Sequence, residues 1–248
     1  MQLNFAAREV TLKLVYYGPA LSGKTTNMHA LHRLMNEDCR GRLMTLDTRD
    51  DRTLFFDMLP IVVRLDPTEA DAPPDSSSGM SVRVKVFTVP GQVVHAATRK
   101  LVLQGADGVA FIADSQTSET ANNAASFLDL RANLKELGIS TRAMPLVIQF
   151  NKRDLPNARS AAELDALAKR GREPVYAATA LTGQGVLETF FGLLQLVWTK
   201  LEAEHQLARS IGIAPGAFVP TAARKLGIAS DVRQLIAANI GGAGAGAR

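Results

Sequence analysis

One glycine-containing segment constrains this chain more than any other: Gly18-Pro19-Ala20-Leu21-Ser22-Gly23-Lys24-Thr25. It has the pattern G-x-x-x-x-G-K-[ST], with an apolar run before it (10–17) and a helical pattern after it (25–35). The glycines let consecutive N–H groups turn inward, and the N-terminus of the following helix adds positive potential. A glycine turn before an amphipathic helix is the alternative. We predict that this loop and Thr26 bind nucleotide phosphates, that Lys24 reaches the outer phosphates, and that Thr25 holds Mg²⁺.

Apolar runs alternate with helical patterns along most of the chain. Strands are expected at 10–17, 41–47, 60–65, 82–89, 108–114, 145–150 and 174–178, and helices at 25–35, 118–137, 160–170 and 185–207. This order predicts an α/β fold of the P-loop NTPase type: a doubly wound, mostly parallel sheet with one antiparallel edge strand, 60–65, paired with 82–89. Ligands of such sheets bind beyond the carboxyl ends of the strands.

The remaining segments divide the chain. We expect one domain over 1–208, a mobile loop over 48–60, and an exposed, proline-rich and acidic loop insert at 66–79. The C-terminal extension, 209–248, is expected to form one or two short helices between 221 and 240, followed by a flexible Gly/Ala tail. Two interpretations of the extension stay open: helices packed on the domain, or a segment that docks a partner or masks a surface.

Composition excludes several classes of protein. The net charge of +4 is spread along the chain, so we expect no direct binding of nucleic acid. No apolar run is long enough to span a bilayer, Gln2 stands where myristoylation requires glycine, and Cys39 is the single cysteine. We expect a cytoplasmic protein without a membrane anchor of its own, which reaches a membrane or a cell pole only through a partner.

A second motif identifies the base. Asn151-Lys152-Arg153-Asp154 directly follows the expected strand 145–150, at the edge where the nucleotide should lie. The Asp154 carboxylate can accept hydrogen bonds from N1–H and the 2-amino group of guanine, which adenine does not offer. The stem of Lys152 can cover the purine face, and Asn151 can tie this loop to the phosphate loop.

A third segment, Thr179-Ala180-Leu181, follows the last expected strand. One of its backbone N–H groups can meet guanine O6. A turn of small residues before a helix explains the same sequence. The segment therefore agrees with the prediction of guanine binding but is not sufficient evidence for it.

Together these segments resemble the Ras-like small GTPases over about residues 8–205, and the bacterial MglA-type polarity GTPases in particular. The signature segments are Tyr16-Tyr17-Gly18-Pro19, Asp51-Arg52-Thr53-Leu54-Phe55-Phe56-Asp57, Thr88-Val89-Pro90-Gly91-Gln92 and Gln149-Phe150-Asn151-Lys152-Arg153-Asp154-Leu155-Pro156-Asn157. The resemblance implies a Ras-like fold, a GTP/GDP cycle with Mg²⁺, slow GTP hydrolysis stimulated by a Roadblock-fold dimer of the MglB type, and effectors in cell polarity or surface motility.

The resemblance also implies roles for the switch segments. Thr53 completes the Mg²⁺ ligands when GTP is bound, Gly91 senses the γ-phosphate through its N–H, and Gln92 orients the attacking water. Gln92, Lys24 and Arg52 form the expected catalytic set. Arg52 is expected to act as an arginine finger supplied in cis, with a solvated loop charge as the alternative.

Other features of the first switch segment stay open. Thr48 and Arg49 are alternative positions for a polar group that reaches the phosphates. The apolar run Leu54-Phe55-Phe56 serves either core packing in one nucleotide state or contact with an effector.

Two departures from Ras-like proteins affect these expectations. Thr88 stands where their D-x-x-G motif has the aspartate that orients Mg²⁺, a substitution shared with MglA-type proteins. Asp57 is either a compensating carboxylate or a helix- or turn-capping residue. The insert and the extension also look longer than in MglA-type proteins, so partners need not carry over unchanged.

Three functions are compatible with these motifs. The first is a GTP/GDP switch that hydrolyses GTP. The second is a scaffold that holds guanine nucleotide and hardly hydrolyses it, which Thr88, the insert and the extension motivate. The third is a nucleotide kinase, against which the guanine motif and the lack of a recognisable acceptor lid argue.

Overall fold

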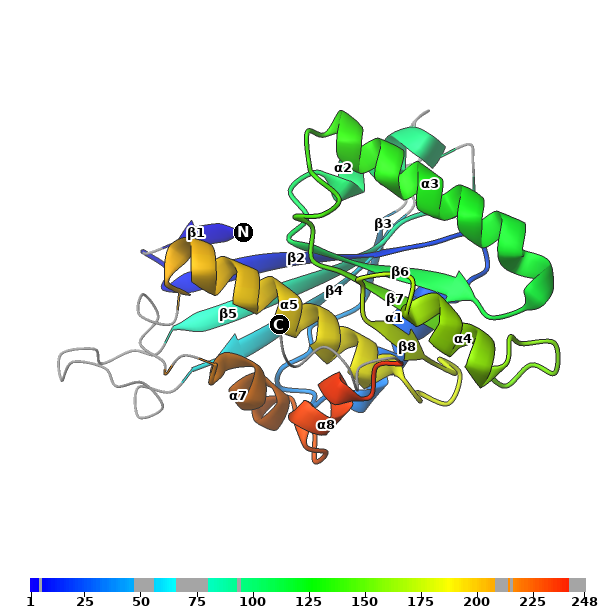
Figure 1. Cartoon of the computed structure of the whole chain (residues 1–248). Helices are drawn as coiled ribbons and strands as arrows, with labels where there is room; N and C mark the ends of the chain where they lie inside the picture. Colours follow the sequence, from blue (N-terminus) through cyan, green and yellow to red (C-terminus); the bar gives the residue numbers. More distant parts are fainter. Residues whose placement is uncertain are drawn as a thin grey trace.

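In the computed structural model, the described residues are 1–4, 6–46, 56–65, 80–92, 95–207, 214 and 216–240. A mixed β-sheet runs through the centre of the molecule (Figure 1). Its strands are β1 Gln2–Asn4, β2 Glu9–Tyr17, β3 Met44–Leu46, β4 Phe56–Arg64, β5 Ser81–Thr88, β6 Gly108–Asp114, β7 Leu146–Asn151 and β8 Val175–Ala177. They lie in the order β3-β4-β5-β2-β6-β7-β8, and β1 pairs antiparallel with β2.

The sheet confirms the predicted α/β architecture and corrects its edge. Strand β2 is parallel to β5 and β6, and β6, β7 and β8 follow in parallel. Strand β4 is antiparallel to β5 as expected, but β3 pairs with its outer side, so β4 is internal and β3 forms the edge. The chain after the first helix covers β4, since Val62 N donates to Cys39 O at 2.8 Å and Gly41 N donates to Pro60 O at 2.8 Å.

The expectation of a loop over 48–60 is wrong for its last residues. Strand β4 begins at Phe56, because Met58 pairs with Phe87 of β5 and with Met44 of β3. The Phe56 ring packs near the Phe87 ring, with 5.8 Å between centroids. The rest of that expected loop and the insert at 66–79 lie outside the described residues.

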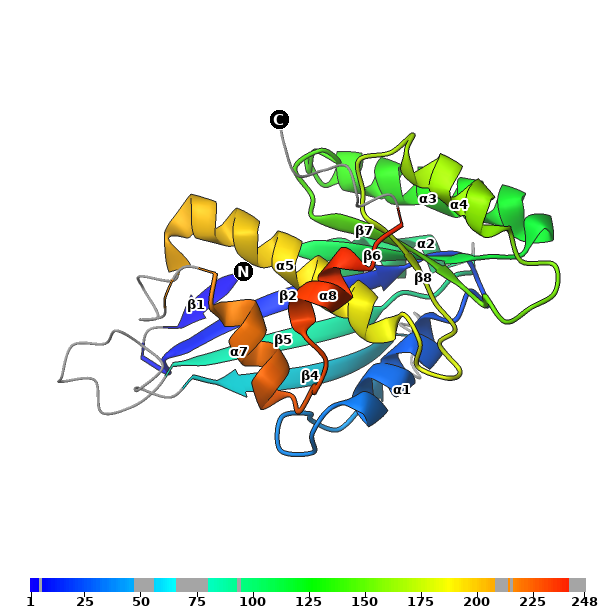
Figure 2. The same cartoon turned by 60° about the horizontal axis from the view of Figure 1, so that its bottom comes forward.

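Helices cover both faces of the sheet (Figures 1 and 2). They are α1 Lys24–Leu34, α2 Ala96–Leu103, α3 Thr120–Glu136, α4 Ala161–Ala168, α5 Val186–His205, α7 Phe218–Lys225 and α8 Val232–Ala237, with a 3₁₀ turn, η3, at Thr117–Glu119. Alternate residues of β2 face opposite sides. Leu12 and Leu14 pack in the cluster of α1, α5 and α7, whereas Val15 and Tyr17 pack in the cluster of α2 and α3.

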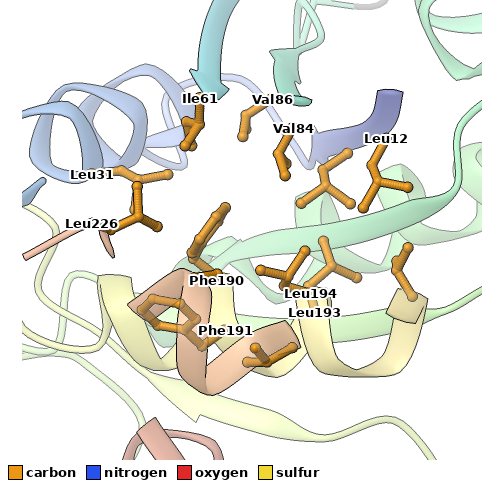
Figure 3. Packing of buried hydrophobic residues seen from close by; sticks show 14 of the residues in the cluster. Leu12, Leu31, Ile61, Val84, Val86, Phe190, Phe191, Leu193, Leu194 and Leu226 are labelled. Atoms are coloured by element: carbon orange, nitrogen blue, oxygen red, sulfur yellow. The ribbon is translucent and has the colours of Figure 1, made fainter. Parts of the chain in front are cut away.

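The C-terminal extension belongs to the first of these cores. Trp198 of α5 and Phe218 of α7 stack with ring centroids 3.9 Å apart. Leu226, just after α7, joins Leu31 of α1 in the same buried cluster (Figure 3), and Asn36 N donates to the Leu226 carbonyl at 2.9 Å. The prediction of short helices between 221 and 240 is therefore confirmed, with the first helix starting at Phe218. Residues 241–248 lie outside the described residues.

The extension also reaches the sheet. Ile240 N donates to Val175 O of β8 at 2.6 Å, and the Tyr176 hydroxyl donates to Ile236 O at 3.0 Å. These contacts favour the packed interpretation for the described part of the extension. Among the described helices, none is both long and apolar enough to cross a bilayer.

Truncation of Phe218 tests this packing. Phe218→Ala removes a fully buried ring stacked on Trp198, so the free energy of unfolding should fall by about 3–5 kcal/mol in urea denaturation. The exposed Gln234 of α8 provides the control, since Gln234→Ala should change stability by less than about 0.5 kcal/mol. Equal stabilities of the two variants would mean that α7 is not part of the core.

Candidate functional site

The phosphate loop connects β2 to α1 and depends on its glycines. Gly18 and Gly23 have φ of 144° and 95°, which side chains rarely adopt. A Cβ at Gly18 would lie 2.2 Å from the Ile112 carbonyl oxygen, and one at Gly23 would lie 2.2 Å from Asn151 Nδ2. Gly23 immediately precedes α1, so the helix N-terminus faces the loop.

Lys24 lies across this loop. Its Nζ donates to the carbonyl oxygens of Gly18 at 2.9 Å and Pro19 at 2.6 Å. Burial, with a smaller contribution from the nearby Arg99 cation, lowers the pKa of Lys24 to about 8. A buried ammonium whose pKa is lowered gains from an anion beside it, as a phosphate would provide.

A hollow of about 780 Å³ opens in front of the phosphate loop. Many of the residues predicted from the sequence line it: Ala20, Leu21, Gly23, Lys24, Thr25, Thr26, Gly91 and Gln92. Ser22 is buried behind them, with its carbonyl used in the contact described next.

Asn151 joins three loops. Its Nδ2 donates to the Ser22 carbonyl at 2.9 Å, and its Oδ1 accepts from the Ala180 N–H at 2.9 Å. The side chain is buried, so these hydrogen bonds are shielded from water. The predicted tie between the guanine motif and the phosphate loop is thus confirmed, and the segment 179–181 is held by the same residue.

The rest of the guanine motif presents a free carboxylate. Lys152 has a left-handed φ of 64°, and its Nζ donates to Asp114 Oδ2 at the end of β6 at 2.6 Å. Asp154 is exposed, and its carboxylate has no hydrogen-bond or ion-pair partner among the described residues. A second hollow, of about 480 Å³, is lined by Asp154 and Thr179.

The segment 179–181 offers one N–H group. Thr179 N donates to Gln184 O at 3.0 Å, and Ala180 N donates to Asn151. Within the described part of the chain, the Leu181 N–H has no acceptor, and its side chain is exposed. Leu181 is therefore the position at which a guanine O6 contact can be made without breaking an existing hydrogen bond.

Asp57 converges with three threonine hydroxyls at the edge of the first hollow. Its Oδ2 accepts from Thr25 Oγ1 at 2.8 Å and from Thr88 Oγ1 at 3.1 Å, and its Oδ1 accepts from Thr45 Oγ1 at 2.8 Å. The Asp57 N–H also donates to Thr88 Oγ1 at 3.1 Å. Since Asp57 lies in β4, the interpretation as a helix- or turn-capping residue is wrong. A carboxylate among hydroxyl oxygens is a donor set that suits Mg²⁺.

The second switch segment lies against the phosphate loop. A Cβ at Gly91 would come within 2.3 Å of Ala20 N, so only glycine fits there. Gln92 is exposed, and its carbonyl accepts from Arg99 Nη1 at 2.5 Å. Arg52 and Thr53, the predicted residues of the first switch, lie outside the described residues, as do Thr48 and Arg49.

A partly buried network behind Gln92 was not predicted from the sequence. Arg99 Nε donates to Asp129 Oδ2 at 2.8 Å, and the same carboxylate oxygen accepts from the Tyr17 hydroxyl. Asn133 Nδ2 donates to that hydroxyl at 3.1 Å. Burial, together with the Asp129 hydrogen bond, raises the pKa of Tyr17. The available signal was the one arginine of the helix Ala96–Leu103, in which most of the other residues are apolar.

Comparisons with known proteins identify the family. No protein-family model matches the chain. The chain is 42% identical over 200 residues to the mutual gliding-motility protein MglA of Myxococcus xanthus, covering 81% of this chain and 97% of that protein. It is 27% identical over 114 residues to ADP-ribosylation factor-like protein 6 of Caenorhabditis briggsae, covering 44% of this chain and 59% of that protein. The chain thus belongs to the MglA-type family of Ras-like small GTPases.

Proposed function

We propose that this protein is a molecular switch that binds GTP and GDP, hydrolyses GTP, and controls bacterial polarity or surface motility through partners. The observation that carries the proposal is the side chain of Asn151, which holds the guanine motif, the phosphate loop and the 179–181 segment together. One nucleotide can then contact all three loops. The similarity to a gliding-motility protein supports the cellular role.

Guanine selection would come from Asp154 and Leu181. The Asp154 carboxylate accepts the two donors on the guanine edge, and the Leu181 N–H donates to O6. The Lys152 ammonium is held by Asp114 at 2.6 Å, which leaves its apolar stem to lie against the purine. Adenine would leave both the carboxylate and the N–H without partners, which is costly in a desolvated site.

Mg²⁺ would be held by Thr25 and, in the GTP state, by Thr53. The Asp57 carboxylate replaces the aspartate that Thr88 displaces, because Asp57 reaches the Thr25 hydroxyl from the neighbouring strand β4. When bound, Mg²⁺ neutralises charge on the β- and γ-phosphates. The protein contributes the oxygen ligands and holds them at a fixed distance from the phosphate loop.

Hydrolysis would use the second switch. Gln92 orients water toward the γ-phosphate, while Lys24 and Arg52 stabilise the negative charge that spreads over the phosphate oxygens. The N–H of Gly91 senses the γ-phosphate, so loss of this phosphate releases the segments around Thr53 and Gly91. Partner proteins would read this difference between the two states.

We infer that the partners include a Roadblock-fold activating dimer of the MglB type. The proposed setting is the cytoplasm, with recruitment to a pole by such partners. The basis is the similarity to MglA, together with an active site whose glutamine is exposed rather than held in place. A partner that orders Gln92 and Arg52 would raise a slow basal rate.

Variants that move the carboxylate from position 57 in β4 to position 88 in β5 test the proposed Mg²⁺ site. Asp57→Asn should raise the Mg²⁺ concentration for half-maximal GTP hydrolysis by about 10–100-fold, because a carboxylate ligand is lost. Thr88→Asp alone should destabilise the protein, since it adds a second carboxylate about 3 Å from the first. The double variant Asp57→Asn/Thr88→Asp should recover most of the Mg²⁺ affinity.

Asp38→Asn, at an exposed position outside the site, is the charge-matched control and should behave like the wild type. An unchanged Mg²⁺ dependence in Asp57→Asn would show that Asp57 has no part in holding the metal.

Single-turnover hydrolysis tests the switch. The wild type should hydrolyse GTP slowly and should be accelerated by a cognate Roadblock-type dimer, whereas Gln92→Leu should lose about 10²–10⁴-fold of the stimulated rate. Gln234→Leu makes the same chemical change on α8, remote from the phosphate loop, and should hydrolyse like the wild type. Bound GTP that is not turned over by the wild type, with or without the dimer, would favour the scaffold function instead.

A further inference from the structure

A strongly basic hollow lies at the end of the strands that is opposite the phosphate loop. It has a volume of about 820 Å³, and its lining residues come from α3, the loops that precede β7 and β8, and the second half of α5. Its lining includes Arg131, Arg142, Arg170, Arg172 and Lys200. We call this site the basic hollow.

The guanidinium groups of the basic hollow are uncompensated. Arg131, Arg142, Arg170 and Arg172 have no side-chain hydrogen bond or ion pair within the described part of the chain. By contrast, Arg83, Arg99 and Arg159 elsewhere pair with carboxylates.

The nearby acidic groups do not neutralise these arginines. Among the described residues of the lining, Glu173 is the one carboxylate, and its Oε2 accepts from the Arg172 backbone N–H at 3.1 Å. Lys200 pairs at 4.0 Å with Glu204, outside the lining. Like charges that converge in a concave surface repel one another and concentrate a positive potential there.

The basic hollow is separate from the nucleotide site. Asn151 is the last residue of β7, at the end of the strand where the nucleotide is proposed to bind. Arg142 and Pro145 precede the first residue of β7, at its opposite end. Strand β7 has 6 residues and is ~20 Å long at about 3.3 Å per residue. A nucleotide held by Asn151 and the phosphate loop therefore does not reach the arginines.

We propose that the basic hollow is a second ligand site, which binds a phosphate-bearing anion. Guanidinium groups bind phosphate through paired N–H donors, and several phosphate charges match several arginines better than a single carboxylate does. Ser140 and Thr141 in the lining add hydroxyl donors. The half-buried side chains of Phe127 and Leu196 supply an apolar wall for the rest of the ligand. Both an anionic lipid headgroup and a soluble phosphorylated compound have this chemistry.

Charge-matched triple variants test this site. GDP-loaded protein, freed of excess Mg²⁺, is titrated with inorganic tripolyphosphate in a calorimeter, so that the phosphate loop is already filled. Arg142→Gln/Arg170→Gln/Arg172→Gln should bind at least about tenfold more weakly than the wild type, through loss of charge-assisted hydrogen bonds.

The control removes the same charge elsewhere. Arg42→Gln/Arg64→Gln/Arg233→Gln changes exposed residues outside the basic hollow and should bind like the wild type. Thermal unfolding of both triple variants should match the wild type, because all six side chains are exposed. Nucleotide-free protein would also bind tripolyphosphate at the phosphate loop. GDP loading is therefore verified by chromatography before each titration. Failure of the protein to load GDP would contradict the proposed function and not the basic hollow.

A vesicle experiment identifies the source of the phosphate. Sedimentation with phosphatidylcholine vesicles, with and without phosphatidylglycerol, is compared for the wild type and the two triple variants. Arginine-dependent binding to the anionic vesicles assigns the site to a lipid headgroup, and arginine-dependent binding of tripolyphosphate alone assigns it to a soluble compound. Binding of neither probe by the wild type, or equal binding by both triple variants, would overturn the proposal and leave an acidic protein surface or solvent facing these arginines.

Discussion

The side-chain amide of Asn151 makes the hydrogen bonds on which the whole site depends. It donates to Ser22 in the phosphate loop and accepts from Ala180 in the loop after β8. Because Asn151 itself ends β7, the amide joins loops from three parallel strands at one edge of the sheet. Gly23 makes the contact possible, since any side chain there would collide with this amide. The same amide therefore fixes the relative positions of the loop proposed to bind the phosphates and the loops proposed to bind the base.

In the proposed Mg²⁺ site, the carboxylate comes from β4 rather than from β5. Thr88 in β5 lacks the carboxylate that Ras-like proteins use, and Asp57 in β4 directs its carboxylate to the same hydroxyl groups. The antiparallel register of β4 and β5, with Met58 opposite Phe87, brings the two residues together.

The sequence predicted what contiguous motifs encode. The phosphate loop and the guanine motif lie at the strand ends where the sequence predicted them, because each is a short segment at the carboxyl end of a single strand, Glu9–Tyr17 and Leu146–Asn151 respectively. The sequence offered Asp57 as a compensating carboxylate, but its contacts with Thr25, Thr45 and Thr88 were not predictable, because they depend on the pairing of β3, β4 and β5. The start of β4 at Phe56 and the edge position of β3 were missed for the same reason. Arg99 and Asp129 meet only after α2 and α3 pack.

Competition between guanine and adenine nucleotides tests whether Asp154 and Leu181 select guanine. Displacement of a fluorescent GDP analogue by GTP and by ATP is measured on the wild type and on Asp154→Ala. GTP should displace the analogue at concentrations at least about 10³-fold lower than ATP, because adenine leaves the Asp154 carboxylate and the Leu181 N–H unpaired. Asp154→Ala should lose most of this preference. Equal displacement of the analogue by GTP and ATP on the wild type would contradict the selection of guanine by Asp154 and Leu181.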